Sequence, residues 1–124
     1  MTDYTMILGN KTYSSWSLRG WLLARQAGIA FKEVVIPLRQ PDTRAQILHY
    51  SPAGKVPTLL ADGEAVWDSL AITEYLAETY PAQGLWPSDP AARRLARCVA
   101  AEMHSGFAAL RSVLPMDLSK HYPG

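Results

Sequence analysis

Three serines lie within four positions where a predicted strand passes into a predicted helix. Ser14, Ser15 and Ser17 stand in the stretch TYSSWSLRGW, residues 12–21. The first backbone N–H groups of a helix have no partner within it, so a serine there can cap the helix. A hydroxyl at the same place can also donate a hydrogen bond to a bound thiolate, which lowers a thiol pKa from its free value of about 8.5. Taken alone, the three serines are consistent with capping or with thiolate binding.

A Val-Pro pair precedes another predicted strand. Pro57 opens this strand, where its missing N–H is tolerated. X-Pro bonds are cis in only about 5–6% of cases in folded proteins, so the dipeptide alone favours a trans bond. A cis bond would leave the N–H and C=O of Val56 free of the sheet. An extended peptide could then pair with Val56 as an added strand.

An Asp-Ser pair stands at the start of a further predicted helix. Ser69 is placed to cap this helix, whose N-terminus carries free N–H groups and a partial positive charge. Such an end binds a carboxylate readily. Asp68 beside it could bind an ammonium group, so the pair would suit both ends of an amino acid. A plain helix cap next to a solvated acid explains the same two residues.

The remaining candidates give weaker signals. His49, His104 and His121 lack the spacing of metal ligands, so we expect surface or packing roles and no metal. Cys98 falls within a predicted helix and is expected to be inert. We expect core or interface positions for Trp16, Trp21, Trp67 and Trp86, and one solvated helix side for Arg93, Arg94 and Arg97.

The elements that must position these residues follow the order β-α-β-α-β-β-α over roughly the first 80 residues. Strands are predicted over 4–9, 31–36, 57–60 and 65–67, and helices over 15–27, 42–50 and from 69 to just before Pro81. The first strand–helix–strand unit implies a parallel pair with a right-handed crossover. The turn Ala61-Asp62-Gly63 predicts an antiparallel hairpin. The fold class is therefore α/β, a thioredoxin-like domain with a mixed four-stranded sheet and helices on both faces.

A linker rich in Pro and Gly, residues 80–88, leads into a second unit. Asp89 is a good N-cap and Pro90 a good first residue for a helix predicted to run to about Leu114. Its apolar residues recur at helical spacing: Leu95, Val99, Met103, Phe107 and Leu110. We expect a first domain over 1–81 and part of an all-α domain over 82–124. The apolar stripe must pack on the first domain, on a partner or on a remainder of the second domain.

Composition narrows the class of protein. The chain has 124 residues, of which 48% are hydrophobic and 19% charged, typical of about one globular domain. The net charge of +1 predicts no binding to nucleic acid or to an anionic membrane. A single cysteine suits a reducing compartment, and we expect the cytoplasm. We find no signal peptide in MTDYTMILGN and no apolar run near the ~18 residues of a membrane span.

Three of these stretches, in this order, resemble the N-terminal domain of glutathione S-transferases. The likeness is greatest to the serine-type, zeta-like and related bacterial members. The matching pieces are SSWS with LR at 14–19, SPAGKVPTL at 51–59 and VWDSLAITEYL at 66–76. The likeness covers residues 4 to about 81 and continues through LWPSDPAARRLARCVAAEMHSGF, the first helix of the family's all-helical second domain. Trp16 departs from the pattern, because zeta enzymes have cysteine there.

The resemblance implies a role for each candidate residue. It implies glutathione as co-substrate, with the cysteinyl backbone on Val56 before a cis Pro57. Asp68 and Ser69 would hold the γ-glutamyl end, and Lys55 could reach the glycyl carboxylate. Ser14, with Ser15 as the neighbouring candidate, would carry the thiolate hydrogen bond.

The resemblance also implies partners: a small electrophile of unknown identity and a second copy of the chain in a homodimer. Family members bind the electrophile mainly against the second domain. We therefore expect this chain to be truncated and its electrophile pocket to be incomplete.

Three functions are compatible with this fold to different degrees. The first is a glutathione transferase that activates the glutathione thiolate for attack on a small electrophile. The alternative is a non-catalytic module that binds glutathione or another protein, because one fold serves both uses. A disulfide or dehydroascorbate reductase ranks last, because it needs a cysteine where Ser14 or Trp16 stands.

Overall fold

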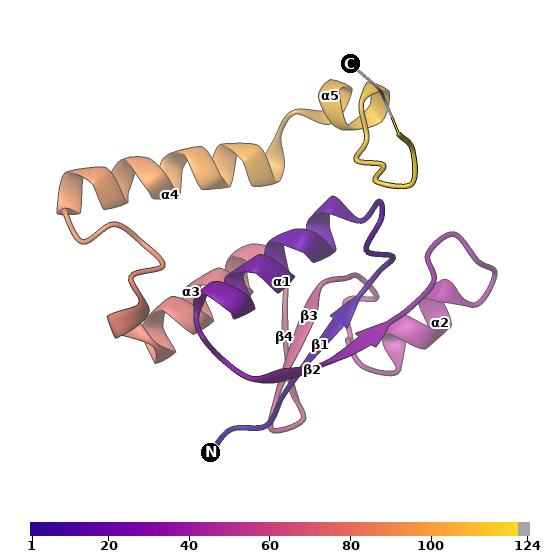
Figure 1. The fold of residues 1–124 in the computed structure, drawn as a ribbon, viewed down its shortest axis with the longest axis horizontal. Coiled ribbons are helices and arrows are strands. Elements are labelled where there is room, and N and C mark those ends of the chain that lie inside the picture. Colours follow the sequence, from indigo (N-terminus) through magenta and orange to yellow (C-terminus); the bar gives the residue numbers. More distant parts are fainter. Residues whose placement is uncertain (122–124) are drawn as a thin grey trace.

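A mixed four-stranded sheet forms the centre of the first part of the chain in the computed structural model, which describes residues 1–121 (Figure 1). The elements are β1 (Tyr4–Leu8), α1 (Ser15–Gln26), β2 (Phe31–Val35), α2 (Thr43–Leu48), β3 (Thr58–Ala61), β4 (Glu64–Trp67), α3 (Ser69–Thr79), the short 3-10 helix η1 (Pro81–Gln83), α4 (Pro90–Ser105) and α5 (Ala108–Val113). The predicted order and type of the first seven elements are confirmed, with ends that differ by one or two residues.

The sheet has the strand order β2-β1-β3-β4. β1 and β2 are parallel, with Tyr4 opposite Phe31, as the predicted crossover through α1 requires. β3 is antiparallel to both β1 and β4. The hairpin between β3 and β4 turns at Asp62 and Gly63, which have φ of 50° and 85°. Positive φ at both turn residues is the geometry that an Asp-Gly pair favours.

Successive residues of β1 supply two cores on opposite faces of the sheet. Met6 and Leu8 point to one face and pack with buried residues of α1 and α3, such as Ala24 and Ile72. Ile7 points to the other face and packs with residues beside and within α2. This alternation explains why the first strand reads as a continuous apolar run. Figure 1 shows α1 and α3 together on one side of the sheet and α2 on the other, as predicted.

The second part of the chain differs from the prediction, because the helix expected over 90–114 is divided in two. Asp89 caps α4 through the N–H of Ala92 at 2.9 Å, as expected. α4 ends at Ser105, where Gly106 is extended and Phe107 has a φ of 61°. Glycine is a weak helix former. The guanidinium of Arg111 donates to the carbonyls of Met103 and His104, which satisfies groups that a helix end exposes.

The apolar stripe of α4 is not packed on the first domain. Leu95, Val99 and Met103 are 58%, 53% and 38% exposed, so the first of the three predicted arrangements is wrong for this chain. Arg97 also departs from the prediction of a purely solvated helix side. It forms an ion pair with Glu74 of α3 at 3.3 Å. Within residues 1–121, no helix is both long enough and apolar enough to cross a membrane.

Candidate functional site

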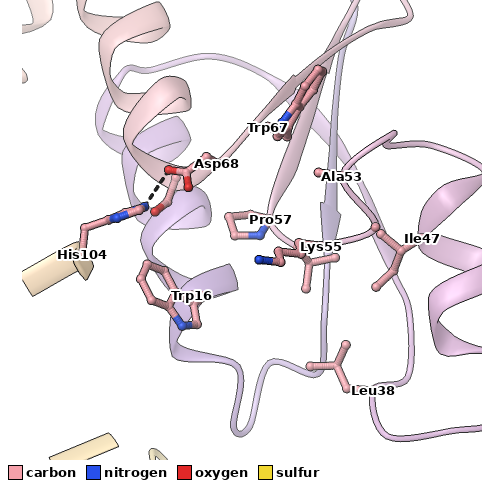
Figure 2. Close-up of a pocket in the computed structure, with 12 residues that line it drawn as sticks. Trp16, Leu38, Ile47, Ala53, Lys55, Pro57, Trp67, Asp68 and His104 are labelled. Atoms are coloured by element: carbon pink, nitrogen blue, oxygen red, sulfur yellow. Dashed lines mark hydrogen bonds and ion pairs between the residues drawn. The ribbon is translucent and has the colours of Figure 1, made fainter. Parts of the chain in front are cut away.

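A cavity of about 790 Å³ lies where the first residues of α1 and α3 meet the loop before β3. Its size is that of a small-molecule site. The lining residues come from six segments: Trp16, Leu38, Ile47, the loop residues Ala53, Gly54, Lys55, Val56 and Pro57, then Trp67, Asp68 and Ser69, and His104 of α4. Figure 2 shows Pro57 and Lys55 between Asp68 and His104 on one side and Leu38 and Ile47 on the other. The cavity therefore brings together five candidate residues separated by up to 14 positions in sequence: Lys55, Val56, Pro57, Asp68 and Ser69.

The Val56–Pro57 peptide bond is cis. The trans bond favoured by the dipeptide alone is wrong, and the cis bond implied by the family resemblance is present. β3 begins one residue later, at Thr58. Among the described residues, the backbone hydrogen bonds outside helices and strands do not use the N–H and C=O of Val56.

A glycine of α1 allows this loop to lie close to the helix. A Cβ on Gly20 would stand 2.9 Å from both Cβ and Cγ of Pro57. Real Cβ atoms do not approach other atoms so closely, so a side chain at position 20 would push the loop outward. The glycine in the stretch LRGW thus permits the close approach of Pro57, which lines the cavity.

The N-cap of α3 is Asp68, not Ser69 as predicted. Asp68 Oδ1 accepts a hydrogen bond from the N–H of Leu70 at 2.9 Å, and Ser69 is the first helical residue. A carboxylate is as good an N-cap as a hydroxyl and also favours the positive end of the helix. Asp68 has a φ of 71° and ψ of 137°, a conformation that residues other than glycine seldom adopt. Strained backbone of this kind is frequent at functional sites.

The sequence did not predict the partner of Asp68. His104 Nε2 lies 2.7 Å from Asp68 Oδ1, and Figure 2 shows the imidazole reaching Asp68 from α4. The two residues are 36 positions apart and lie on different parts of the chain, so no local spacing could indicate the pair. The apolar stripe gave no signal either, because it does not pack on the first domain.

Ser14 and Ser15 occupy the predicted helix start but do not line the cavity. Ser14 is the N-cap of α1, 8% exposed, and its Oγ accepts from the N–H of Ser17 at 3.3 Å. The hydroxyls of Ser14 and Ser17 lie 2.8 Å apart. Ser17 Oγ in turn accepts from the N–H of Gly9 at 2.8 Å. The capping role is confirmed, and Ser17 links it to the end of β1.

Trp16 and two arginines form the wall beside these serines. The guanidinium carbons of Arg19 and Arg111 each lie 4.2 Å from the centre of a Trp16 ring, a cation–π distance. Burial, and then the charge of Arg111, lowers the pKa of Arg19. His104 packs edge-on against Trp16, with ring centres 5.1 Å apart. Trp16 therefore lines a cavity, although the sequence alone favoured a core or interface position.

The cavity carries charges of both signs at its polar places. Asp68 supplies a carboxylate next to the free N–H groups at the start of α3. Lys55 is exposed and supplies an ammonium group on the loop before β3. Val56, which follows Lys55 in the sequence, also lines the cavity and offers its backbone N–H and C=O. Such a set suits an extended zwitterionic peptide. Within residues 1–121, no group of three His, Cys, Asp or Glu side chains is placed to hold a metal ion.

Known proteins share this fold and these motifs. The family model for the glutathione S-transferase N-terminal domain matches residues 13–79. A probable maleylacetoacetate isomerase from Caenorhabditis elegans is 35% identical over 104 residues, covering 84% of this chain and 48% of that protein. The maleylacetoacetate isomerase of Rhizobium meliloti is 40% identical over 87 residues, covering 69% of this chain and 41% of that protein.

A solved structure supports the same relation. A glutathione transferase homologue from Burkholderia, solved with bound glutathione, superposes with a TM-score of 0.76 at 28% identity, covering 91% of this chain and 62% of that one. The chain therefore spans about half the length of the curated relatives it matches.

Proposed function

Because the chain belongs to the glutathione S-transferase family, we propose that it binds glutathione in the cavity and activates the thiol for attack on a small electrophile. One observation carries the proposal. A helix N-terminus, a carboxylate and an unpaired stretch of backbone border one cavity beside the start of α1. Each of these groups matches one part of a γ-glutamyl tripeptide.

Each part of the tripeptide has a counterpart in the proposed site. The γ-glutamyl ammonium binds Asp68, and its carboxylate binds the N–H and hydroxyl groups at Ser69, at the positive end of α3. The cysteinyl backbone pairs with the N–H and C=O of Val56 before the cis Pro57. Lys55 takes the glycyl carboxylate. Glutathione is thus the co-substrate, and no metal is needed.

Activation of the thiol depends on the hydroxyl chain at the β1–α1 junction. In the structure the Ser14 hydroxyl donates to Ser17 Oγ at 2.8 Å, and because hydroxyl hydrogens rotate, this bond can reverse when glutathione binds. With the Ser17 hydroxyl donating to Ser14, the Ser14 hydroxyl is free to donate to a thiolate. The chain then runs from the Gly9 N–H through Ser17 and Ser14 to sulfur, and such chains strengthen each bond in them. Ser15, the first helical residue, is the second candidate for this bond.

A non-catalytic glutathione-binding module remains the second candidate function. Ser14 is 8% exposed and lies outside the cavity lining, which is the observation in its favour. In that case the site would bind glutathione without changing its thiol pKa. The two functions therefore differ in one measurable quantity.

The thiol pKa of bound glutathione separates the two candidates. Thiolate absorbance in the ultraviolet, titrated with pH at saturating protein, should give a pKa lowered by about one to two units, or roughly 1.4–2.8 kcal/mol. Ser14→Ala should raise the thiol pKa of bound glutathione to that of free glutathione without abolishing binding. Ser17→Ala should raise this pKa part of the way. Ser15→Ala tests the second candidate: the lowered pKa should persist in this variant if Ser14 makes the bond to sulfur. Binding with an unshifted pKa in the wild type would establish the non-catalytic module, and failure to bind glutathione would contradict both.

The wider context of the site forms part of the same proposal. We infer a domain boundary near residue 81 and a second domain that begins at 82, of which α4 is the first long helix. The exposed stripe of α4 is then the surface for a homodimer, and the electrophile binds between the cavity and the second domain. The single cysteine is the reason to propose a reducing compartment, the cytoplasm.

A further inference from the structure

The contact between His104 and Asp68 joins the second part of the chain to the cavity. The side chain of His104 is 24% exposed and that of Asp68 is 48% exposed, so both remain open to a ligand on one side. His104 lies in the last turn of α4, and Asp68 is the N-cap of α3. A helix outside the sheet domain thereby reaches the carboxylate that we assign to the ligand ammonium.

The two oxygens of this carboxylate have different surroundings. Oδ1 of Asp68 accepts from the Leu70 N–H at 2.9 Å and lies 2.7 Å from His104 Nε2. Within the part of the chain that the structure describes, Oδ2 has no hydrogen-bond partner. Two bonds to one oxygen fix the plane of the carboxylate. They leave the other oxygen, with its lone pairs, for an added donor.

The position of His104 is itself held from two directions. Its ring packs edge-on against Trp16 at 5.1 Å, with an angle of 78° between the planes. Arg111 donates to the carbonyl of His104 and also stands over Trp16. The last turn of α4 is therefore fastened to the start of α1. A fastened imidazole loses little freedom when it holds Asp68, so its bond is effective in orienting the carboxylate.

We propose that His104 is a positioning residue of the glutathione site, which holds Asp68 Oδ1 so that Oδ2 faces the γ-glutamyl ammonium. This inference rests on the proposed function, because it assigns the ligand of that same carboxylate. It predicts that His104 contributes to the recognition of one group only, the α-amino group of glutathione. A merely structural role would affect every ligand of the cavity equally.

The test compares two ligands that differ in that group. Glutaryl-cysteinyl-glycine is glutathione with the α-amino group replaced by hydrogen. Calorimetry on the full chain gives the ratio of its dissociation constant to that of glutathione. We expect a ratio of about ten or more in the wild type, since a bond between charged groups is strong. His104→Leu, which keeps packing on Trp16 but cannot donate, should lower this ratio roughly fivefold. His104→Gln, which keeps an N–H donor, should retain most of it.

Arg97→Ala provides the matched control on the same helix. It breaks the ion pair between α4 and Glu74 but leaves the cavity lining intact, so the ratio should not change. An unchanged ratio in His104→Leu overturns the inference, as does an equal loss in His104→Gln. Either result leaves the proposed function standing if the wild type binds glutathione. Failure of the wild type to bind glutathione contradicts the proposed function and this inference together.

Discussion

At the scale of single residues, the functional side chains have partners that a linear sequence does not reveal. Asp68 lies beside His104, and Ser14 beside Ser17. The spacing of Ser14 and Ser17 is that of an N-cap and the N3 position of a helix, so the sequence could have predicted their contact. The pair of Asp68 and His104 depends on how α4 packs over α1 and α3. It could not have been predicted, because the two residues are 36 positions apart and no sequence pattern around either one indicates the other.

Glu33 of β2 gives a prediction that belongs to one residue. Its carboxylate accepts hydrogen bonds from Lys11 and from the indole of Trp21, and these bonds lower the pKa of Glu33 below its ordinary value of 4.5. A carboxylate with a lowered folded pKa stabilises the folded state fully above its unfolded pKa. That contribution is lost as the pH falls from about 4.5 through the folded pKa.

The free energy of unfolding of wild type and Glu33→Gln, measured by urea denaturation between pH 3 and 7, should test this. The wild type should be the more stable above about pH 5, and the difference should shrink below pH 4.5. Lys11→Met should remove much of the same difference, and the double variant should lose little more. A difference between wild type and Glu33→Gln that stays constant down to pH 3 would contradict the assignment.

At the scale of elements, the order of the first seven and the mixed sheet followed from the sequence. A continuous apolar run indicated β1, which is buried on both faces, and β-branched and aromatic residues indicated β2. Turn residues indicated the β3–β4 hairpin, which Asp62-Gly63 fits. Two features at the ends of elements could not be predicted from the residue pattern. The break at Gly106 needed knowledge of Arg111, which bonds the carbonyls at the end of α4 from a different helix. The cis bond before Pro57 came from the family resemblance, since the dipeptide alone favours trans.

The contact of α1 with the loop before β3 gives a prediction at this scale. In an exposed helix, Gly→Ala stabilises by about 1 kcal/mol, because alanine has the higher helix propensity. Here the new methyl group would meet the ring of Pro57 at 2.9 Å. Overpacking of this kind costs about 1–3 kcal/mol, so Gly20→Ala should destabilise the fold by about 1–2 kcal/mol. It should also weaken glutathione binding, since the loop carries Val56.

Thermal or urea denaturation together with calorimetry would measure both effects. Gln26→Ala, at the exposed end of the same helix, should leave stability and binding nearly unchanged. If Gly20→Ala has the same free energy of unfolding as the wild type, the loop moves away from the new methyl group at no energetic cost. The close approach of Pro57 to α1 would then not constrain the loop.

At the scale of the whole molecule, the two parts of the chain differ in how they bury apolar surface. The sheet domain has two cores with fully buried residues on both faces. α4 contains no buried residue. It reaches the sheet domain through the ion pair of Arg97 and through His104, which bonds Asp68 and packs on Trp16. A helix whose apolar stripe is exposed and not packed on the adjacent domain is typical of a surface that pairs with another polypeptide.

The proposed homodimer leads to a prediction about the apolar stripe of α4. Sedimentation equilibrium of the wild-type chain should give a dimer, and Leu95→Glu or Val99→Glu should shift it to a monomer. The reason is that a buried carboxylate without a partner costs several kcal/mol, while the exposed side chain in a monomer tolerates it. Arg94→Glu, at an exposed position of the same helix outside the stripe, also makes the charge more negative and should keep the dimer.

The cavity residues lie on other elements except for His104, so glutathione affinity should be retained in a monomeric Val99→Glu variant. A wild type that sediments as a monomer at high concentration would contradict the dimer. A dimer unaffected by both stripe variants would place its interface on another surface.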